Sequence, residues 1–163
     1  MSDTQNTPYI HCMLIPLQQH YLLLPNSTIT EVIPRASIAH TTNSSKTWLE
    51  HIDWQQITVP VVDLEKLLTE SVDQIYRASK LCIIAGINNE ANIEFYAFPC
   101  TGSPQLITLN ATAFKLTHDT NDSAYLHCQI KIGNQIAFVP NLDELELLIQ
   151  QNKLSENKLA EID

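Results

Sequence analysis

The sequence predicts a mainly β protein made of small barrels or a sandwich. Short apolar or alternating segments, separated by turn residues, recur along the chain as is typical of such folds. Helical spacing occurs in only two places, and both helical segments begin with the same motif, which favours two similar barrel units. The expected strands are 9–15, 21–24, 29–33, 57–62, 80–87, 93–98, 105–109, 124–132 and 135–139.

The connections between these strands carry turn residues. Residues 16–20 suit a hairpin connection between the first two strands, and residues 88–92 predict a turn rich in asparagine. Gly133 and Asn134 predict a tight hairpin turn in which both residues supply positive φ. The polar stretch 36–45 is expected to be a mobile loop.

Both helical segments follow a strand that ends near a proline. The stretches 59–68 and 139–148 align without a gap, and Val, Pro, Asp and two Leu are identical in them. A carboxylate at the start of a helix accepts hydrogen bonds from its free N–H groups. We therefore expect Asp63 and Asp143 to cap these helices. After the second helix, residues 150–158 predict an extension that frays into a solvated tail.

Composition and charge exclude several classes of function. The 163 residues carry a formal charge of −9, which argues against nucleic acid and anionic lipid as partners. Only three glycines are present, too few for a phosphate-binding loop or a dinucleotide fingerprint. No signal peptide or membrane-spanning stretch is apparent, which predicts a cytoplasmic protein without membrane insertion.

The cysteines and histidines suggest a metal or a thiol site only weakly. A zinc site could be assembled from His11-Cys12 and His127-Cys128, but neighbours in a strand point to opposite faces, so core thiols are the better interpretation. A catalytic thiol needs an electropositive, partly exposed niche that an apolar strand does not provide. We expect no metal, no cofactor and no catalytic residue.

Two alternative functions are compatible with these residues. One is a β-barrel module that binds a small molecule or a metal through His118, Asp119 and His127. The other, the weakest, is a hydrolytic or redox enzyme that uses Cys100 or Cys128.

One block of the chain resembles a known family. Glu31-Val32-Ile33-Pro34 is followed, after a polar loop, by Trp48 to Leu64, which ends in Val-Pro-Val-Val-Asp-Leu. This pattern is similar to that of CheW chemosensory coupling proteins, which typically read E-V-I-P, a loop, and then G-V-I-N-L-R-G-x-x-V-P-V-V-D-L. The resemblance extends over nearly the whole chain, and its specific part is Val59 to Leu64.

The resemblance implies a fold and a set of partners. The fold would be two intertwined five-stranded barrels with short helices and a C-terminal helix, forming one domain over 9–152, with flexible tails at 1–8 and 153–163. The function would be a non-enzymatic cytosolic adaptor between the regulatory domain of a CheA-type histidine kinase and the cytoplasmic tip of a methyl-accepting chemoreceptor. The residues that would face these partners are Ile29, Glu31, Val32, Glu50, Asp53, Trp54, Gln55 and Gln56.

The chain departs from the family pattern where partner choice would be decided. Asp53-Trp54-Gln55-Gln56 stands where the family has Asn-Leu-Arg-Gly, so a guanidinium and a permissive glycine are lost. This predicts a divergent branch, such as an accessory adaptor of a chemosensory system that governs type IV pilus twitching. Trp54 itself could serve as an exposed docking anchor or fill the barrel core, and the alternation from Val59 leaves both roles open.

Overall fold

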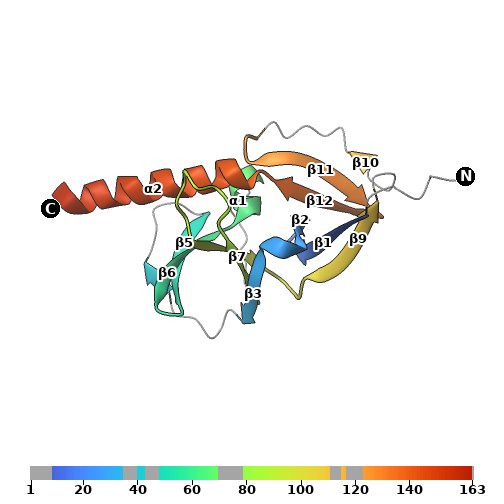
Figure 1. Cartoon of the computed structure of the whole chain (residues 1–163), viewed down its shortest axis with the longest axis horizontal. Helices are drawn as coiled ribbons and strands as arrows, with labels where there is room; N and C mark the ends of the chain where they lie inside the picture. The colour runs from blue at the N-terminus through green and yellow to red at the C-terminus, as the bar shows by residue number, and fades with distance from the viewer. Residues whose placement is uncertain are drawn as a thin grey trace, which may run out of the picture.

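The structure, a computed structural model, describes residues 9–34, 40–42, 48–69, 79–110, 115–116 and 123–162. Two sheets of six strands dominate these residues (Figure 1). Sheet A has the order β10 (Lys115–Leu116), β11 (Leu126–Ile132), β12 (Gln135–Pro140), β2 (Tyr21–Pro25), β1 (Tyr9–Pro16) and β9 (Gln105–Asn110). Sheet B has the order β3 (Ile29–Pro34), β7 (Lys80–Ala85), β8 (Phe95–Cys100), β6 (Ile57–Val62), β5 (Leu49–Trp54) and β4 (His40–Thr42).

This arrangement confirms the expected fold class. Five strands in each sheet have five residues or more, and the sixth is short: β10 has two residues and β4 has three. Sheet A is built from the two ends of the chain and sheet B from its middle, since the chain enters sheet B after β2 and returns to sheet A at β9. The two units are therefore intertwined.

Both sheets must curl toward closed barrels. Six flat strands would hold their outer edges about 24 Å apart. The edge strands β9 and β10 are joined by residues 111–114, and β3 and β4 by residues 35–39. Such links reach about 18 and 22 Å when fully extended, less than the width of a flat sheet. Among the described strands the two edges of each sheet are not paired with each other, so each sheet is an open barrel.

Three apolar clusters follow from this arrangement. One cluster fills sheet A and includes Cys12, Leu14 and Leu109, and a second fills sheet B and includes Ile52 and Trp54. The largest, which we name the inter-sheet core, takes side chains from both sheets and both helices; examples are Ile15, Leu22, Val62, Tyr96, Phe98, Phe138, Leu142, Leu145 and Ile149. Burial of this apolar surface is what holds the two units together.

Two helices lie against the inter-sheet core. Helix α1 (Leu64–Thr69) directly follows β6, and α2 (Leu142–Ile162) follows β12. In α2 the buried residues Leu142, Leu145 and Ile149 repeat with helical spacing and form the stripe that faces the core. The helix continues through residues 153–162, past the domain boundary expected at 152. That domain boundary stays a prediction. Residues 1–8 and 163 lie outside the described part of the chain.

The two helices are capped by different residues of the repeated motif. In α1 the backbone N–H of Lys66 donates to Asp63 Oδ1 at 3.1 Å. In α2 the cap is Asn141, whose Oδ1 accepts from the N–H of Glu144 at 3.3 Å, so the prediction that Asp143 is the cap was wrong. The reason is that β12 ends at Pro140 and the helix begins at once, whereas β6 continues two residues beyond Pro60.

Several other details differ from the expectation. Strand β5 was missed because polar or charged residues at 50, 51 and 53 separate its buried Leu49, Ile52 and Trp54. Strand β4 lies inside the stretch expected to be a polar loop. In the β11–β12 turn Gly133 has a φ of 60°, but Asn134 does not have a positive φ.

Candidate functional site

The turn between β5 and β6 has an unusual backbone. Trp54 pairs with Ile57, so Gln55 and Gln56 alone form the turn. Both glutamines are exposed and left-handed, with φ of 48° and 68°. Such two-residue turns favour Asn-Gly because positive φ crowds the Cβ of other residues. Gln55 and Gln56 are therefore both strained, and both are among the predicted docking residues.

Relief of this strain is expected to stabilise the fold. The double substitution Gln55→Asn and Gln56→Gly should raise the free energy of unfolding by about 1–2 kcal/mol, because both new residues tolerate the left-handed region. Urea unfolding measures the change. Asn134→Gly is the matched control in the other hairpin, where φ is not positive and no gain is expected. A destabilised double variant would contradict this interpretation.

Trp54 belongs to the core of sheet B. Its side chain is 8% exposed and meets Phe95 edge to face, with ring centroids 5.2 Å apart. The indole Nε1–H donates to Glu31 Oε2 at 3.2 Å. Because β3 and β5 are four places apart in the sheet, this bond joins strands that the curl has brought together. The indole thus fills the barrel and positions Glu31, and its N–H binds a carboxylate instead of the backbone.

The other predicted site residues fall into three groups. Glu31, Asp53, Gln55 and Gln56 are exposed around Trp54, at what we name the turn end of sheet B. Ile29 and Val32 are half-buried against the inter-sheet core. Glu50 lies four residues from Trp54 along β5, about 13 Å away, and its charge acts on Asp63 instead.

Only the first of these groups therefore brings exposed carboxylates and amides to one end of the sheet. A partner could contact its carboxylates and amides at once, whereas Glu50 belongs to the opposite end of the sheet.

A scan against protein-family models matches the chain to the CheW-like domain over residues 11–147. The chain belongs to the CheW family. Its structure is similar to the crystal structure of the scaffolding protein TtCheW from Thermoanaerobacter tengcongensis, with a TM-score of 0.65 and 14% sequence identity. The similarity covers 85% of this chain and 92% of that chain, which shows a shared fold. No curated protein sequence matches the chain.

In this CheW-like chain the most specific block of the family pattern forms β6 and the start of α1. Val59, Val61 and Val62 are buried, and Asp63 follows as the helix cap. Burial is the main cause of a raised pKa at the Asp63 carboxyl, and the N–H of Lys66 opposes it. The block is therefore chiefly structural. The exposed β5–β6 turn lies shortly before it in the sequence.

The raised pKa makes a prediction about Asp63. Because the folded carboxyl has the higher pKa, folding takes up protons there, and stability falls as pH rises from the ordinary 3.8 through the raised value. Asp63→Asn keeps an Oδ1 acceptor without the charge, so it is expected to be at least as stable as the native chain at pH 7 and to lose this pH dependence. Asp63→Ala should cost about 1 kcal/mol by loss of the cap. Urea unfolding at several pH values tests both, and an unstable Asn variant would refute the assignment.

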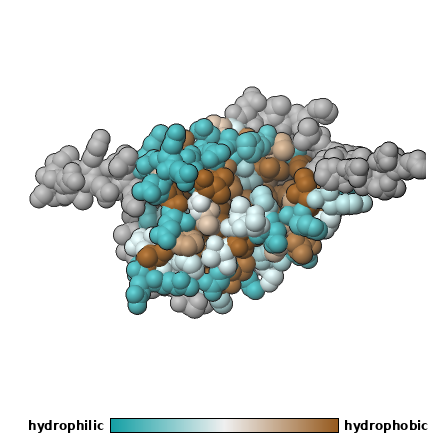
Figure 2. Space-filling view, viewed as in Figure 1, coloured by the Kyte–Doolittle hydropathy of each residue, from teal (hydrophilic) through white to brown (hydrophobic). Residues whose placement is uncertain are grey.

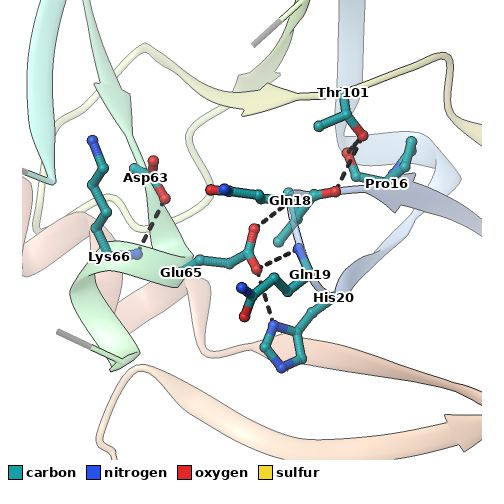
Figure 3. Close-up of polar contacts among 9 residues, drawn as sticks. Pro16, Gln18, Gln19, His20, Asp63, Glu65, Lys66 and Thr101 are labelled. Carbon is teal, nitrogen blue, oxygen red and sulfur yellow. Dashed lines mark hydrogen bonds and ion pairs between the residues drawn. The ribbon is translucent and has the colours of Figure 1, made fainter. Parts of the chain in front are cut away.

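A second polar cluster joins the two sheets of the CheW-like fold, and the sequence did not indicate it. Glu65, on α1, accepts hydrogen bonds from the backbone N–H groups of Gln18 and Gln19 and from His20 Nδ1, the last two at 2.9 Å (Figure 3). The His20 ring lies 4.5 Å from that of Phe138. A signal was present in the single acidic residue on the first turn of α1, but its partners lie more than forty positions away in the sequence.

The described residues do not support the metal or thiol alternatives. They contain no group of three His, Cys, Asp or Glu side chains that could hold a metal ion. His127 is exposed, while His118 and Asp119 lie outside the described ranges. Burial raises the pKa of Cys82 to about 12 and that of Cys100 to about 11, and it also raises those of Cys12 and Cys128. A thiol with a raised pKa is a poor nucleophile at neutral pH.

The surface of the CheW-like domain is mixed. Figure 2 shows hydrophilic residues gathered at the upper left and apolar ones scattered over the rest of this face. Tyr9, Ile10 and Leu106, on β1 and β9, are among the large apolar side chains that remain exposed. Among the described helices, none is long and apolar enough to cross a membrane.

Proposed function

We propose that this chain is a cytoplasmic, non-enzymatic adaptor of a chemotaxis-type signalling system. In this role it couples a CheA-type histidine kinase, through the regulatory domain of the kinase, to chemoreceptors or to other array components. The observation that carries the proposal is the CheW-like domain over residues 11–147. The raised thiol pKa values argue against a cysteine nucleophile.

The turn end of sheet B is the proposed docking surface. Glu31, Asp53, Gln55 and Gln56 are exposed there, and the buried Trp54, which packs on Phe95, holds Glu31 through its indole N–H. Charged and amide side chains of this kind suit the polar rim of a protein–protein interface. The family guanidinium is replaced by Gln55 at this position, so we propose that the chain has a partner preference of its own, as in accessory adaptors of type IV pilus systems.

A three-component sedimentation assay tests this function. Receptor cytoplasmic fragments are displayed on vesicles, and the amount of CheA-type kinase that sediments with them is measured with and without the chain. We expect the chain to increase the sedimented kinase and the charge reversal Asp53→Lys to reduce this effect. Glu144→Lys, on the exposed face of α2, is the matched control and should act like the native chain. No effect of the native chain would contradict receptor coupling.

A further inference from the structure

Glu65 ties a turn of sheet A to a helix that continues sheet B. The turn at residues 17–20 joins β1 to β2, and α1 directly follows β6. One carboxylate receives three hydrogen bonds from this turn, and its side chain is 12% exposed, against 25% for its hydrogen-bond partner His20. Figure 3 shows the three donors converging on Glu65 from one side. We name these contacts the Glu65 clasp.

A second contact between the sheets lies nearby. Thr101, just after β8, donates its backbone N–H to the carbonyl of Pro16 at 2.9 Å, and its hydroxyl donates to the carbonyl of Leu17 at 3.1 Å. The turn is therefore held at its start by Thr101 and further along by the clasp. Of these two contacts, the Glu65 clasp is the one made by α1.

The Glu65 clasp links the two elements next to which the candidate site's segments, β3 and the β5–β6 hairpin, lie in the chain. Strand β3 follows β2 after only the short 3-10 turn Asn26–Thr28, so its position depends on the β1–β2 hairpin. The β5–β6 hairpin ends in α1, which carries Glu65. At the turn end of sheet B the same two segments meet again through the bond from Trp54 to Glu31. The Glu65 clasp thus connects the two segments at one end, and the bond from Trp54 to Glu31 connects them at the candidate site.

We propose that Glu65 is a positioning residue for the docking surface: by holding the β1–β2 turn against α1, it sets the placement of β3 relative to the β5–β6 turn. Gln18 and Gln19 are exposed, so without the carboxylate their N–H groups can bind water. Removal of Glu65 should therefore change the placement of the segments much more than the stability of the fold.

The first test needs no partner protein. We expect Glu65→Ala to accelerate amide hydrogen exchange at Gln18 and Gln19 about tenfold or more, the factor associated with hydrogen bonds to a charged group. We also expect it to shift the NMR resonance of the Trp54 indole N–H and to change the relative orientation of the sheets in residual dipolar couplings, with a fall in Tm of only about 3 °C.

Two further variants complete the design. Glu65→Gln retains one acceptor oxygen and should give an intermediate effect. Glu144→Gln, an exposed carboxylate on α2, should leave exchange, indole resonance and orientation unchanged. Unchanged indole resonance and orientation in Glu65→Ala would overturn the proposal even if exchange at the turn became faster, because the effect would then be local.

A binding measurement separates this inference from the proposed function, on which its functional part rests. With the kinase regulatory domain as the probe, Glu65→Ala should bind about tenfold more weakly than the native chain, although Glu65 lies outside the docking surface. Equal affinity would overturn the positioning role. If the native chain itself fails to bind, the proposed function fails, whereas the indole and orientation results still decide the placement effect.

Discussion

Glu146→Leu is expected to lower the free energy of unfolding by about 3–5 kcal/mol, the cost of leaving several buried polar groups without partners. Glu146 is fully buried on α2. Its carboxylate accepts the N–H groups of Ile87 and Asn88, both at 2.9 Å, and the hydroxyl of Tyr96 at 2.8 Å. Burial and this neighbouring carboxylate raise the pKa of the Tyr96 hydroxyl, which therefore stays a donor.

Urea unfolding, followed by circular dichroism, measures the loss. Glu146→Gln keeps one acceptor oxygen and should cost about 1–2 kcal/mol. Glu144→Leu is the matched control on the exposed side of the same helix and should change stability by less than about 0.5 kcal/mol. A Glu146→Leu variant within 1 kcal/mol of the native chain would show that these hydrogen bonds contribute little.

Gly86→Ala is expected to be comparably severe, with a loss of about 3 kcal/mol or more. A Cβ at position 86 would lie 1.7 Å from the carbonyl oxygen of Ile93, where no side chain fits. The backbone cannot move aside freely, because the N–H of Gly86 donates to the carbonyl of Glu94 at 2.9 Å. The absence of a side chain at this position permits the close approach of the two ends of the β7–β8 connection.

The control for this prediction is another glycine. A Cβ at Gly102 would meet its nearest atom, Pro16 Cγ, at 3.6 Å, an ordinary contact. Gly102→Ala should therefore change the free energy of unfolding by less than about 1 kcal/mol. Thermal unfolding of both variants compares them directly, and equal stability of the two would refute the steric argument for Gly86.

The strands that the sequence predicted share one property. Their buried residues recur within short apolar or alternating runs, as in β1 and β7. Such a pattern can be recognised in the sequence without knowledge of the fold. Strand β5 lacks such a run, because three of its six residues are charged or are histidine. The cap of α2 was misplaced for a related reason: an identical Asp in the repeat did not reveal that the preceding strand ends two residues earlier.

The contacts of the candidate site join residues that are distant in the sequence, so local sequence patterns could not predict them. The environment of Trp54 is decided by Glu31, a neighbour only because sheet B curls. Glu65 and Glu146 looked like ordinary helix-surface carboxylates, yet both accept backbone N–H groups from loops more than forty residues away. A resemblance in one block identified the family, while these contacts required the three-dimensional arrangement.

The partner proposed for this CheW-like chain is the regulatory domain of a CheA-type kinase. Isothermal titration calorimetry of the two purified proteins tests this proposal most directly, at about 100 μM, where a complex with a micromolar Kd is saturated. We expect a one-to-one complex that Asp53→Lys weakens and Glu144→Lys leaves unchanged. Absence of binding by the native chain at this concentration would contradict it.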